Sequence, residues 1–398
     1  MPITNSTCAS TLPDSLTDAA GKFVRASETL TLDSASQGPR LRAVLDAGQA
    51  ALVAGTAPWM LPFTEWEARI EALRSLAADT LFESDTEGVA MVPSVAFALA
   101  TAARNLPLLT GDVVLVLDAQ FPSNLLPWQQ RGVETGARVV AAQRREGQGW
   151  TDALMRAWDA TPGVRVVSVP QAHWHDGALL DIDRVAARAQ QEQVALVLDL
   201  SQSLGAMPAR LAQWQPDFVA SVGHKWLLGP HGLAWLWVAP RWRVQGASLD
   251  QHWQARDAGD DWVFPADAAP PCRRGARRFD AGGVADPLRL AMSAAALGQV
   301  QAWGVENISR RLGQLTASLD HALDAHGLEA WKTPGHAPHF TALRAPDERQ
   351  LDRAADALHQ HGLICTRRAG LLRIAPHLHA DEMDMAKVAR LIADLMRA

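Results

Sequence analysis

A lysine and an aspartate follow two neighbouring apolar runs of the sequence, and their side-chain types suit cofactor chemistry. Asp199 lies near the end of the run VALVLDL (194–200), and Lys225 comes just after the next run, DFVASVG (217–223). Ligands of open α/β sheets bind beyond the carboxyl ends of the strands, so both side chains are expected at one rim of a sheet. No other lysine occurs between residues 90 and 240.

This pair of side chains matches what pyridoxal 5′-phosphate (PLP) requires. A lysine amine can hold the cofactor as a Schiff base, and a carboxylate can keep the pyridine nitrogen protonated, so that the ring withdraws electrons from a substrate Cα. Either residue alone could be structural, Asp199 as a strand-end cap and Lys225 as a solvated loop residue. Their position after consecutive strands, with the small residues Ser221 and Gly223 before the lysine, favours PLP binding and Lys225 as the catalytic residue.

Six short apolar runs predict the sheet that positions these residues. Each run is apolar nearly throughout and is bounded by Gly, Pro or Asp, as is typical of strands buried on both faces. They are residues 111–118, 137–142, 164–170, 194–200, 217–223 and 232–238. Amphipathic helical stretches such as residues 181–193 separate them. Repeated strand–helix–strand units require right-handed crossovers, so we predict an α/β fold with a mostly parallel central sheet.

The character of the sequence changes after residues 270–283. A long helical region runs from about residue 287 to 326, and a smaller α+β unit follows it to the C-terminus. A chain of 398 residues is too long for one compact core. We predict a large α/β domain (41–280), a linker helix with a small α+β domain (281–398), and an N-terminal segment (1–40) that packs on the small domain.

Composition argues against several classes of partner. The net charge of −6 and the pI near 6.1 do not favour nucleic acid or an anionic membrane. The three cysteines lie far apart without a CxxC pair, which argues against a disulfide framework or structural zinc and fits a reducing cytoplasm. The N-terminal residues lack the basic start and apolar stretch of a secretory signal, and no apolar run reaches the roughly 18 residues of a membrane span. A cytoplasmic protein with a small-molecule substrate is therefore expected.

The sequence resembles the class V aminotransferase family of PLP enzymes, which includes cysteine desulfurases, kynureninases and isopenicillin-N-epimerase-like proteins. The resemblance extends from residue 32 to residue 378, and its most specific parts are VLDLSQSLGA (197–206) and GHKWLLGPHG (223–232). Further support comes from residues 91–108, 119–128 and 171–183. The resemblance implies the PLP-dependent transferase fold of the aspartate-aminotransferase type (fold type I), an amino-acid substrate and a homodimer.

The resemblance also implies a role for individual residues. Lys225 corresponds to the Schiff-base lysine and Asp199 to the partner of the pyridine nitrogen. The other matched positions are Gln202 as donor to the phenolic oxygen with His173 nearby, Phe121 stacked on the ring, Ser94 and Val95 in the phosphate-binding turn, Ser221 and His224 as phosphate contacts, and Arg373 as the clamp on the substrate α-carboxylate. Phe121 could instead be core and Ser94 a plain helix cap, whereas a guanidinium in an apolar strand, as at Arg373, needs an anionic partner.

The sequence departs from its relatives at several positions. Tyrosine is absent from the chain, and His224, His231, Trp235 and Trp237 stand where tyrosine is expected. Residues 281–286 read AGGVAD, where relatives offer a hydroxyl or a charged pair toward the cofactor of the neighbouring subunit. The family's cross-subunit phosphate contact is therefore in question.

A metal site is a rival interpretation of the histidines. His173 and His175 form an HxH pair, which His377 with His379, or His336 with His339, could complete. The family pattern accounts for His173 without a metal, so no metal is predicted. The chain also lacks the HExxH, GxxxxGK[ST] and GxSxG motifs of other enzyme classes.

We predict an enzyme that transforms an amino acid through Lys225, with transamination as the leading reaction. Cysteine desulfurase is disfavoured, because Cys365 lies in an apparent strand and not in a flexible loop. Two alternatives remain open. One is another PLP reaction, either lyase chemistry (C–S or kynureninase-like) or epimerisation; the other is a non-catalytic paralogue that keeps the fold and binds PLP.

Overall fold

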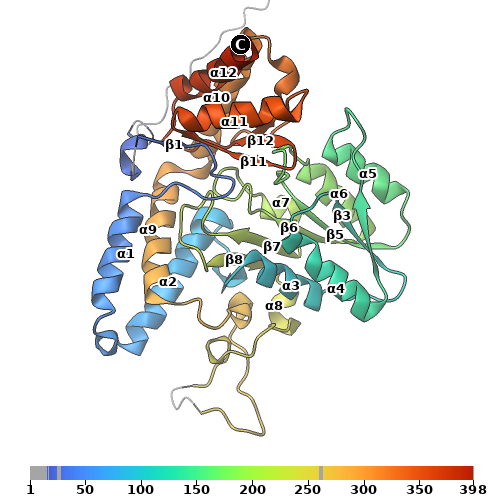
Figure 1. The fold of residues 1–398 in the computed structure, drawn as a ribbon. Helices are drawn as coiled ribbons and strands as arrows, with labels where there is room; N and C mark the ends of the chain where they lie inside the picture. The colour runs from blue at the N-terminus through green and yellow to red at the C-terminus, as the bar shows by residue number, and fades with distance from the viewer. Residues whose placement is uncertain (1–15, 17, 25–27, 260–262, 398) are drawn as a thin grey trace, which may run out of the picture.

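The chain folds into a central sheet covered by helices, with a smaller α+β unit packed beyond one end of it (Figure 1). The structure is a computed structural model that describes residues 16, 18–24, 28–259 and 263–397. The α/β class predicted from the apolar runs is confirmed.

The central sheet has seven strands, and every predicted apolar run supplies one of them. In spatial order they are β2 (Val89–Val92), β8 (Ala234–Val238), β7 (Phe218–Val222), β6 (Ala195–Asp199), β5 (Val164–Pro170), β3 (Val113–Leu117) and β4 (Arg138–Ala142). Strands β7, β6, β5, β3 and β4 pair in parallel, whereas β8 runs antiparallel to both β7 and β2. The prediction of a mostly parallel sheet is confirmed.

Both faces of the sheet are buried, because alternate side chains of each strand enter different cores. In β3, Val113 and Leu115 join one apolar cluster, and Val114 and Val116 join another. The first cluster is completed by α2 (Phe63–Leu81), α5 (Trp150–Asp159), α6 (Ile182–Glu192) and α9 (Pro287–Trp303). The second is completed by α3 (Val95–Asn105) and α4 (Leu126–Thr135). The near-continuous apolar character of the strands follows from this double coverage.

The C-terminal unit has its own apolar cluster. An antiparallel sheet of β11 (Thr366–Arg368), β12 (Leu371–Ile374) and β9 (Thr341–Leu343) packs with α10 (Val305–Ala325), α11 (Glu348–Gln360) and α12 (Glu382–Arg397). Strand β1 (Leu30–Thr31) pairs in parallel with β10 (Leu363–Ile364), so the described part of the N-terminal segment joins this unit. The remaining residues of that predicted segment (1–15, 17 and 25–27, with Cys8 among them) lie outside the described residues.

The long helical region predicted after residue 287 is two helices. Gly304 separates α9 from α10 with a φ of +78°. An L side chain rarely adopts this backbone conformation, whereas glycine does so at little cost. The break lets α9 pack on α1 (Arg42–Ala54) and α2 while α10 packs on α12.

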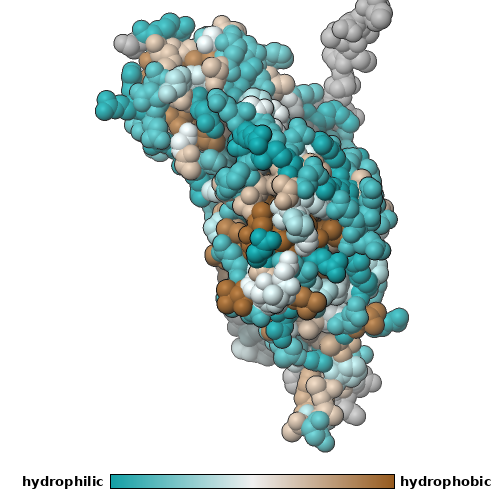
Figure 2. All heavy atoms as spheres, turned by 90° about the vertical axis from the view of Figure 1, so that its right-hand side faces the viewer, coloured by the Kyte–Doolittle hydropathy of each residue, from teal (hydrophilic) through white to brown (hydrophobic). Residues whose placement is uncertain are grey.

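Among the described residues, the remaining α-helices are short: α7 (Leu211–Trp214) and α8 (Trp242–Gln245). Viewed from the side of α4 and α5, the surface is mostly hydrophilic, with a group of hydrophobic residues near its middle (Figure 2). Among the described helices, none combines the length and apolar character that a membrane span needs.

Candidate active site

A cavity of about 310 Å³ opens where β6 and β7 end, and it gathers most of the predicted site residues. Eight of them line it: Ser94, Val95, Phe121, Asp199, Gln202, His224, Lys225 and Arg373. Parallel strands place their carboxyl ends at one rim, which brings residues from distant parts of the sequence together. The other two predicted site residues, His173 and Ser221, do not line this cavity.

Lys225 is delivered to this cavity by the turn after β7. Its Nζ lies 5.6 Å from the centre of the Phe121 ring. Burial lowers the pKa of Lys225 to about 8; Asp199 opposes this change, and the positive charges of Arg373 and Arg368 add to it. A neutral, nucleophilic amine is therefore accessible near physiological pH.

Close backbone packing fixes the turn that carries Lys225. The amide N–H of Gly38 donates to the carbonyl oxygen of His224 at 2.9 Å. A Cβ at Gly38 would lie only 2.1 Å from the Lys225 carbonyl oxygen, so glycine is required there for the close approach. The N-terminal segment thereby holds the lysine turn in place.

Asp199 is the last residue of β6 and is only 6% exposed. One carboxylate oxygen accepts the backbone N–H of Ser201 at 3.0 Å, and the side chain lines the same cavity as Lys225. Burial raises the pKa of Asp199 against the opposing effects of Ser201 and Lys225. A buried carboxylate of this kind favours a cationic partner, such as a protonated ring nitrogen.

The N-terminus of α3 forms another wall of the cavity. Ser94 caps this helix, with its Oγ accepting the backbone N–H of Phe97 at 3.1 Å, and Val95 and Ala96 also line the cavity. The free amides and the positive end of the helix dipole suit a phosphate group here. Ser94 therefore has a structural role as a helix cap, and its predicted contact with the phosphate stays a prediction.

His224 also faces the cavity, and its ring stacks on His231 with the ring centres 3.7 Å apart. Burial, then the charges of His231 and Lys225, lower the pKa of His224 to about 4. His224 is therefore neutral at pH 7 and can contact an anion only as a hydrogen-bond donor. Nε2 of His231 lies 2.6 Å from Nε2 of Gln37, which extends the stack toward the N-terminal segment.

Gln202 lines the cavity while its amide is largely engaged in the protein. Its Nε2 donates to the Ala35 carbonyl at 2.9 Å, and its Oε1 accepts from Trp226 Nε1 at 3.1 Å. An amide nitrogen carries two hydrogens, so one remains for a ligand. The predicted donor role of Gln202 stays a proposal that depends on this second hydrogen.

His173 lies behind the cavity wall. Its ring stacks on Trp150 at 4.5 Å between ring centres, and its Nε2 is 3.2 Å from the carbonyl oxygen of Asp118. The neighbouring Trp174 lines the cavity and packs edge-on against Phe121 at 5.3 Å. Ser221 is likewise buried, with its Oγ 3.4 Å from the carbonyl oxygen of Leu200.

Arg373 has the anionic partner that its place in an apolar strand requires. Its Nη2 lies 3.0 Å from a carboxylate oxygen of Asp33, and it also donates to Ser36 Oγ and to the Trp174 carbonyl. A second arginine of the lining, Arg368, was not predicted from the sequence. The alternation of side chains along β11 places Arg368 on the cavity side of the strand. This orientation follows only from the observed strand register.

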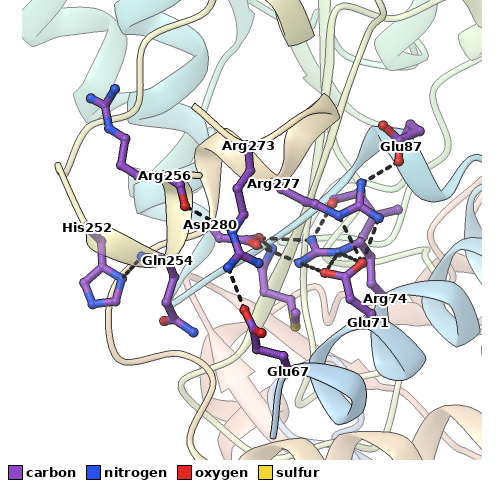
Figure 3. Close-up of polar contacts among 12 residues, drawn as sticks. Glu67, Glu71, Arg74, Glu87, His252, Gln254, Arg256, Arg273, Arg277 and Asp280 are labelled. Atoms are coloured by element: carbon purple, nitrogen blue, oxygen red, sulfur yellow. Dashed lines mark hydrogen bonds and ion pairs between the residues drawn. The ribbon is translucent and has the colours of Figure 1, made fainter. Parts of the chain in front are cut away.

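The segment before residues 281–286 is held by a buried ionic cluster (Figure 3). Arg74 of α2 is 1% exposed and donates to both carboxylate oxygens of Asp280, at 2.6 and 3.1 Å. Asp280 also accepts the backbone N–H of Met91, and the N–H of Ala281 donates to the Met91 carbonyl at 3.0 Å. The cluster therefore ties the segment to β2, next to the turn that carries Ser94.

Comparison with known proteins identifies the family. Residues 31–370 match the model of the family described as Aminotransferase class-V. The chain belongs to the class-V aminotransferase family. Its cofactor is PLP, on which this family depends.

Relatives of this class-V chain differ in the reactions that their names state. It is 27% identical over 325 residues to an uncharacterised aminotransferase of Bacillus subtilis, covering 81% of this chain and 83% of the relative. It is 25% identical over 328 residues to a kynureninase of Monosiga brevicollis, covering 75% and 69%. The apo structure of a cysteine desulfurase from Thermococcus onnurineus superposes with a TM-score of 0.81 at 17% identity, covering 97% and 98%. The last likeness confirms the fold type.

The cavity residues of this class-V protein fit PLP. A buried amine, a buried carboxylate, a flat aromatic ring and a helix N-terminus surround one space, and each has a counterpart on the cofactor: aldehyde, ring nitrogen, ring face and phosphate. Among the described residues, no group of three or more His, Cys, Asp or Glu side chains is placed to hold a metal ion. His336, one of the residues of the rival metal interpretation, pairs with Asp320 at 2.9 Å.

Proposed function

We propose that this chain is a PLP-dependent aminotransferase that acts on an amino acid. The observation that carries the proposal is the presence of Lys225 and Asp199 in one cavity at the carboxyl ends of β6 and β7. When bound, PLP supplies an electron sink for the substrate Cα. Lys225 holds the cofactor through its Nζ and moves the proton at Cα, for which a pKa of about 8 is suitable.

The other cavity residues bind and orient. Asp199 pairs with the ring nitrogen, the amides at the start of α3 bind the phosphate, and Phe121 packs on the ring face. Arg373 binds the substrate carboxylate, for which a guanidinium offers two parallel donors. Its contact with Asp33 supports this role, since the pair keeps the guanidinium charged and oriented.

Cys365 argues against cysteine desulfuration. A desulfurase needs a reactive thiolate on a mobile loop, whereas Cys365 is half-buried between β10 and β11. Burial, together with the charge of Asp33, raises the pKa of Cys365 to about 12. The thiol therefore stays protonated at pH 7 and is a poor nucleophile.

A lyase is the second candidate, and the likeness to a kynureninase favours it among the alternatives. The two reactions are separated by incubating the purified holoenzyme with single amino acids and no amino acceptor. An aminotransferase releases 2-oxo acid only in an amount equal to the enzyme, and repeated turnover begins when a 2-oxo acid acceptor is added. Continuous release of ammonia, sulfide or alanine without an acceptor identifies a lyase, and loss of optical purity alone identifies an epimerase. No change with any amino acid identifies a non-catalytic paralogue.

A homodimer is part of this proposal. Large apolar side chains are exposed together where α1 ends and α2 begins, including Leu52, Val53, Trp59 and Met60, which are 62–78% exposed. Exposed apolar residues that are grouped in this way mark interaction surfaces, whereas single exposed apolar residues are common on any protein surface. The same surface adjoins α9, which begins directly after residues 281–286.

A further inference from the structure

Two guanidinium groups face the cavity from one hairpin. Arg373 lies on β12 and Arg368 on the neighbouring strand β11, and both line the same space as Lys225. The α-carboxylate of an amino acid needs only one of them. The other arginine is therefore available for a different anion.

The two arginines differ in their partners within the protein. Arg373 is buried and its charge is compensated by Asp33 at 3.0 Å. Arg368 is exposed to the cavity side, and its side chain forms no hydrogen bond or ion pair with any residue that the structure describes. The positive charge of Arg368 contributes to lowering the pKa of both Lys225 and Arg373.

The adjacent residue, Arg367, shows that this difference depends on strand geometry. Successive side chains of a strand point to opposite faces, so Arg367 points away from the cavity. There it forms ion pairs with Asp352 and, at 3.5 Å, with Glu348, both on α11. Of the two neighbouring arginines of β11, Arg367 has acidic partners on α11, and Arg368 has none among the residues that the structure describes.

We propose that Arg368 binds a second acidic group of the substrate, so that the preferred substrates are amino acids with a carboxylate or similar anion in the side chain. This inference rests on the proposed function. The phosphate of the cofactor is served by the N-terminus of α3, and the α-carboxylate by Arg373, so the side-chain anion is the remaining negative group for Arg368. A guanidinium that faces a carboxylate in a partly desolvated cavity forms strong paired hydrogen bonds.

The test uses dicarboxylate binding to the holoenzyme, which requires no turnover. Succinate and butyrate have the same number of carbons and differ by one carboxylate. Titration of the absorbance band of the bound cofactor gives a dissociation constant for each. Wild type should bind succinate about tenfold or more tightly than butyrate, as a charge-assisted contact predicts. Arg368→Gln should remove this preference, and Arg367→Gln, the matched control on the same strand, should keep it.

Kinetics with aspartate, glutamate, asparagine and glutamine then separate the possible outcomes. Arg368→Gln should raise the Michaelis constants of aspartate and glutamate about tenfold and leave those of the two amides within about twofold. Equal losses for all four would mean that Arg368 binds the α-carboxylate, and would overturn the proposal. Equal succinate and butyrate affinities in wild type would also overturn it, while reaction with neutral amino acids would leave the proposed function intact. If no amino acid changes the cofactor band, the proposed function itself fails.

Discussion

At the scale of single residues, the buried amine of Lys225 sets how the protein takes up its cofactor. Only the neutral amine attacks an aldehyde, and burial lowers the pKa of Lys225 from 10.5 to about 8. Protonation of the amine therefore blocks the reaction at pH values below about 8, whereas it would block it below about 10.5 for an ordinary lysine.

The first prediction concerns the pH dependence of this uptake. The rate at which the apoprotein binds PLP should rise with pH with a midpoint near 8 and level off above it. Stopped-flow absorbance at a series of pH values measures it. A midpoint near 10.5, the ordinary lysine value, would mean that the amine is solvated and free.

The second prediction concerns Asp199. Asp199→Asn should weaken PLP binding and slow exchange of the substrate Cα proton at least about a hundredfold, because a neutral amide cannot hold the ring nitrogen protonated. Proton exchange in deuterated buffer, followed by NMR, measures the effect. Asp112→Asn is the matched control, since this carboxylate lies at the opposite end of the sheet and accepts the N–H of Leu109 at 2.8 Å. Equal rates in the two variants would return Asp199 to a structural role.

Residue types and spacing were sufficient to bring Asp199 and Lys225 together, because strand ends of a parallel sheet share one rim. They were not sufficient to show that Arg368 lines the cavity or that His173 does not. His173 stacks on Trp150, and the neighbouring Trp174 lines the cavity. Which of two adjacent residues faces a site depends on strand register and turn geometry, and neither is encoded in residue type alone.

At the scale of elements, the ionic cluster of α2 should contribute strongly to stability. Arg74 and Asp280 are both buried, so removal of one leaves the other as an uncompensated charge. Arg74→Met should lower the free energy of unfolding by about 3–5 kcal/mol, measured by urea denaturation.

A control on the same helix separates this effect from general loss of arginine. Arg69 pairs with Glu65 at 2.5 Å, but both side chains are half exposed. Arg69→Met should cost less than about 0.5 kcal/mol. Similar costs for the two variants would mean that the Arg74 cluster is solvated in the protein.

Strand β2 lies outside the six predicted runs. The other six strands of the sheet were predictable because burial on both faces leaves a continuous apolar run with no helical period. The direction of β8 was not, since such a run reads alike in either direction and only the connection decides. The apolar pattern after residue 287 predicted one long helical region, which the structure divides into two helices at Gly304. The break is seen in the positive φ of Gly304.

At the scale of the whole molecule, we predict a homodimer in solution. It should persist at micromolar concentration and bury more than roughly 2,000 Å² in total, as obligate dimers do. Trp59→Asp should raise the dimer dissociation constant, because Trp59 is 78% exposed in the isolated chain. Sedimentation velocity across a dilution series measures it.

Val133→Asp is the control for the dimer, because Val133 is 83% exposed on α4, away from α1 and α2 in Figure 1. This variant should dimerise as wild type does. A monomer at micromolar concentration, or equal weakening by both substitutions, would contradict an interface at the end of α1.

The central claim is that Lys225 carries the cofactor, and borohydride reduction of the holoenzyme tests it most directly. Reduction fixes the cofactor to the amine that holds it, and mass spectrometry of the peptides then identifies that residue. The pyridoxyl group should be found on Lys225 and should be absent from the Lys225→Ala variant. The chain has only three other lysines, Lys22, Lys332 and Lys387. A label on one of them in place of Lys225 would contradict the assignment of the site.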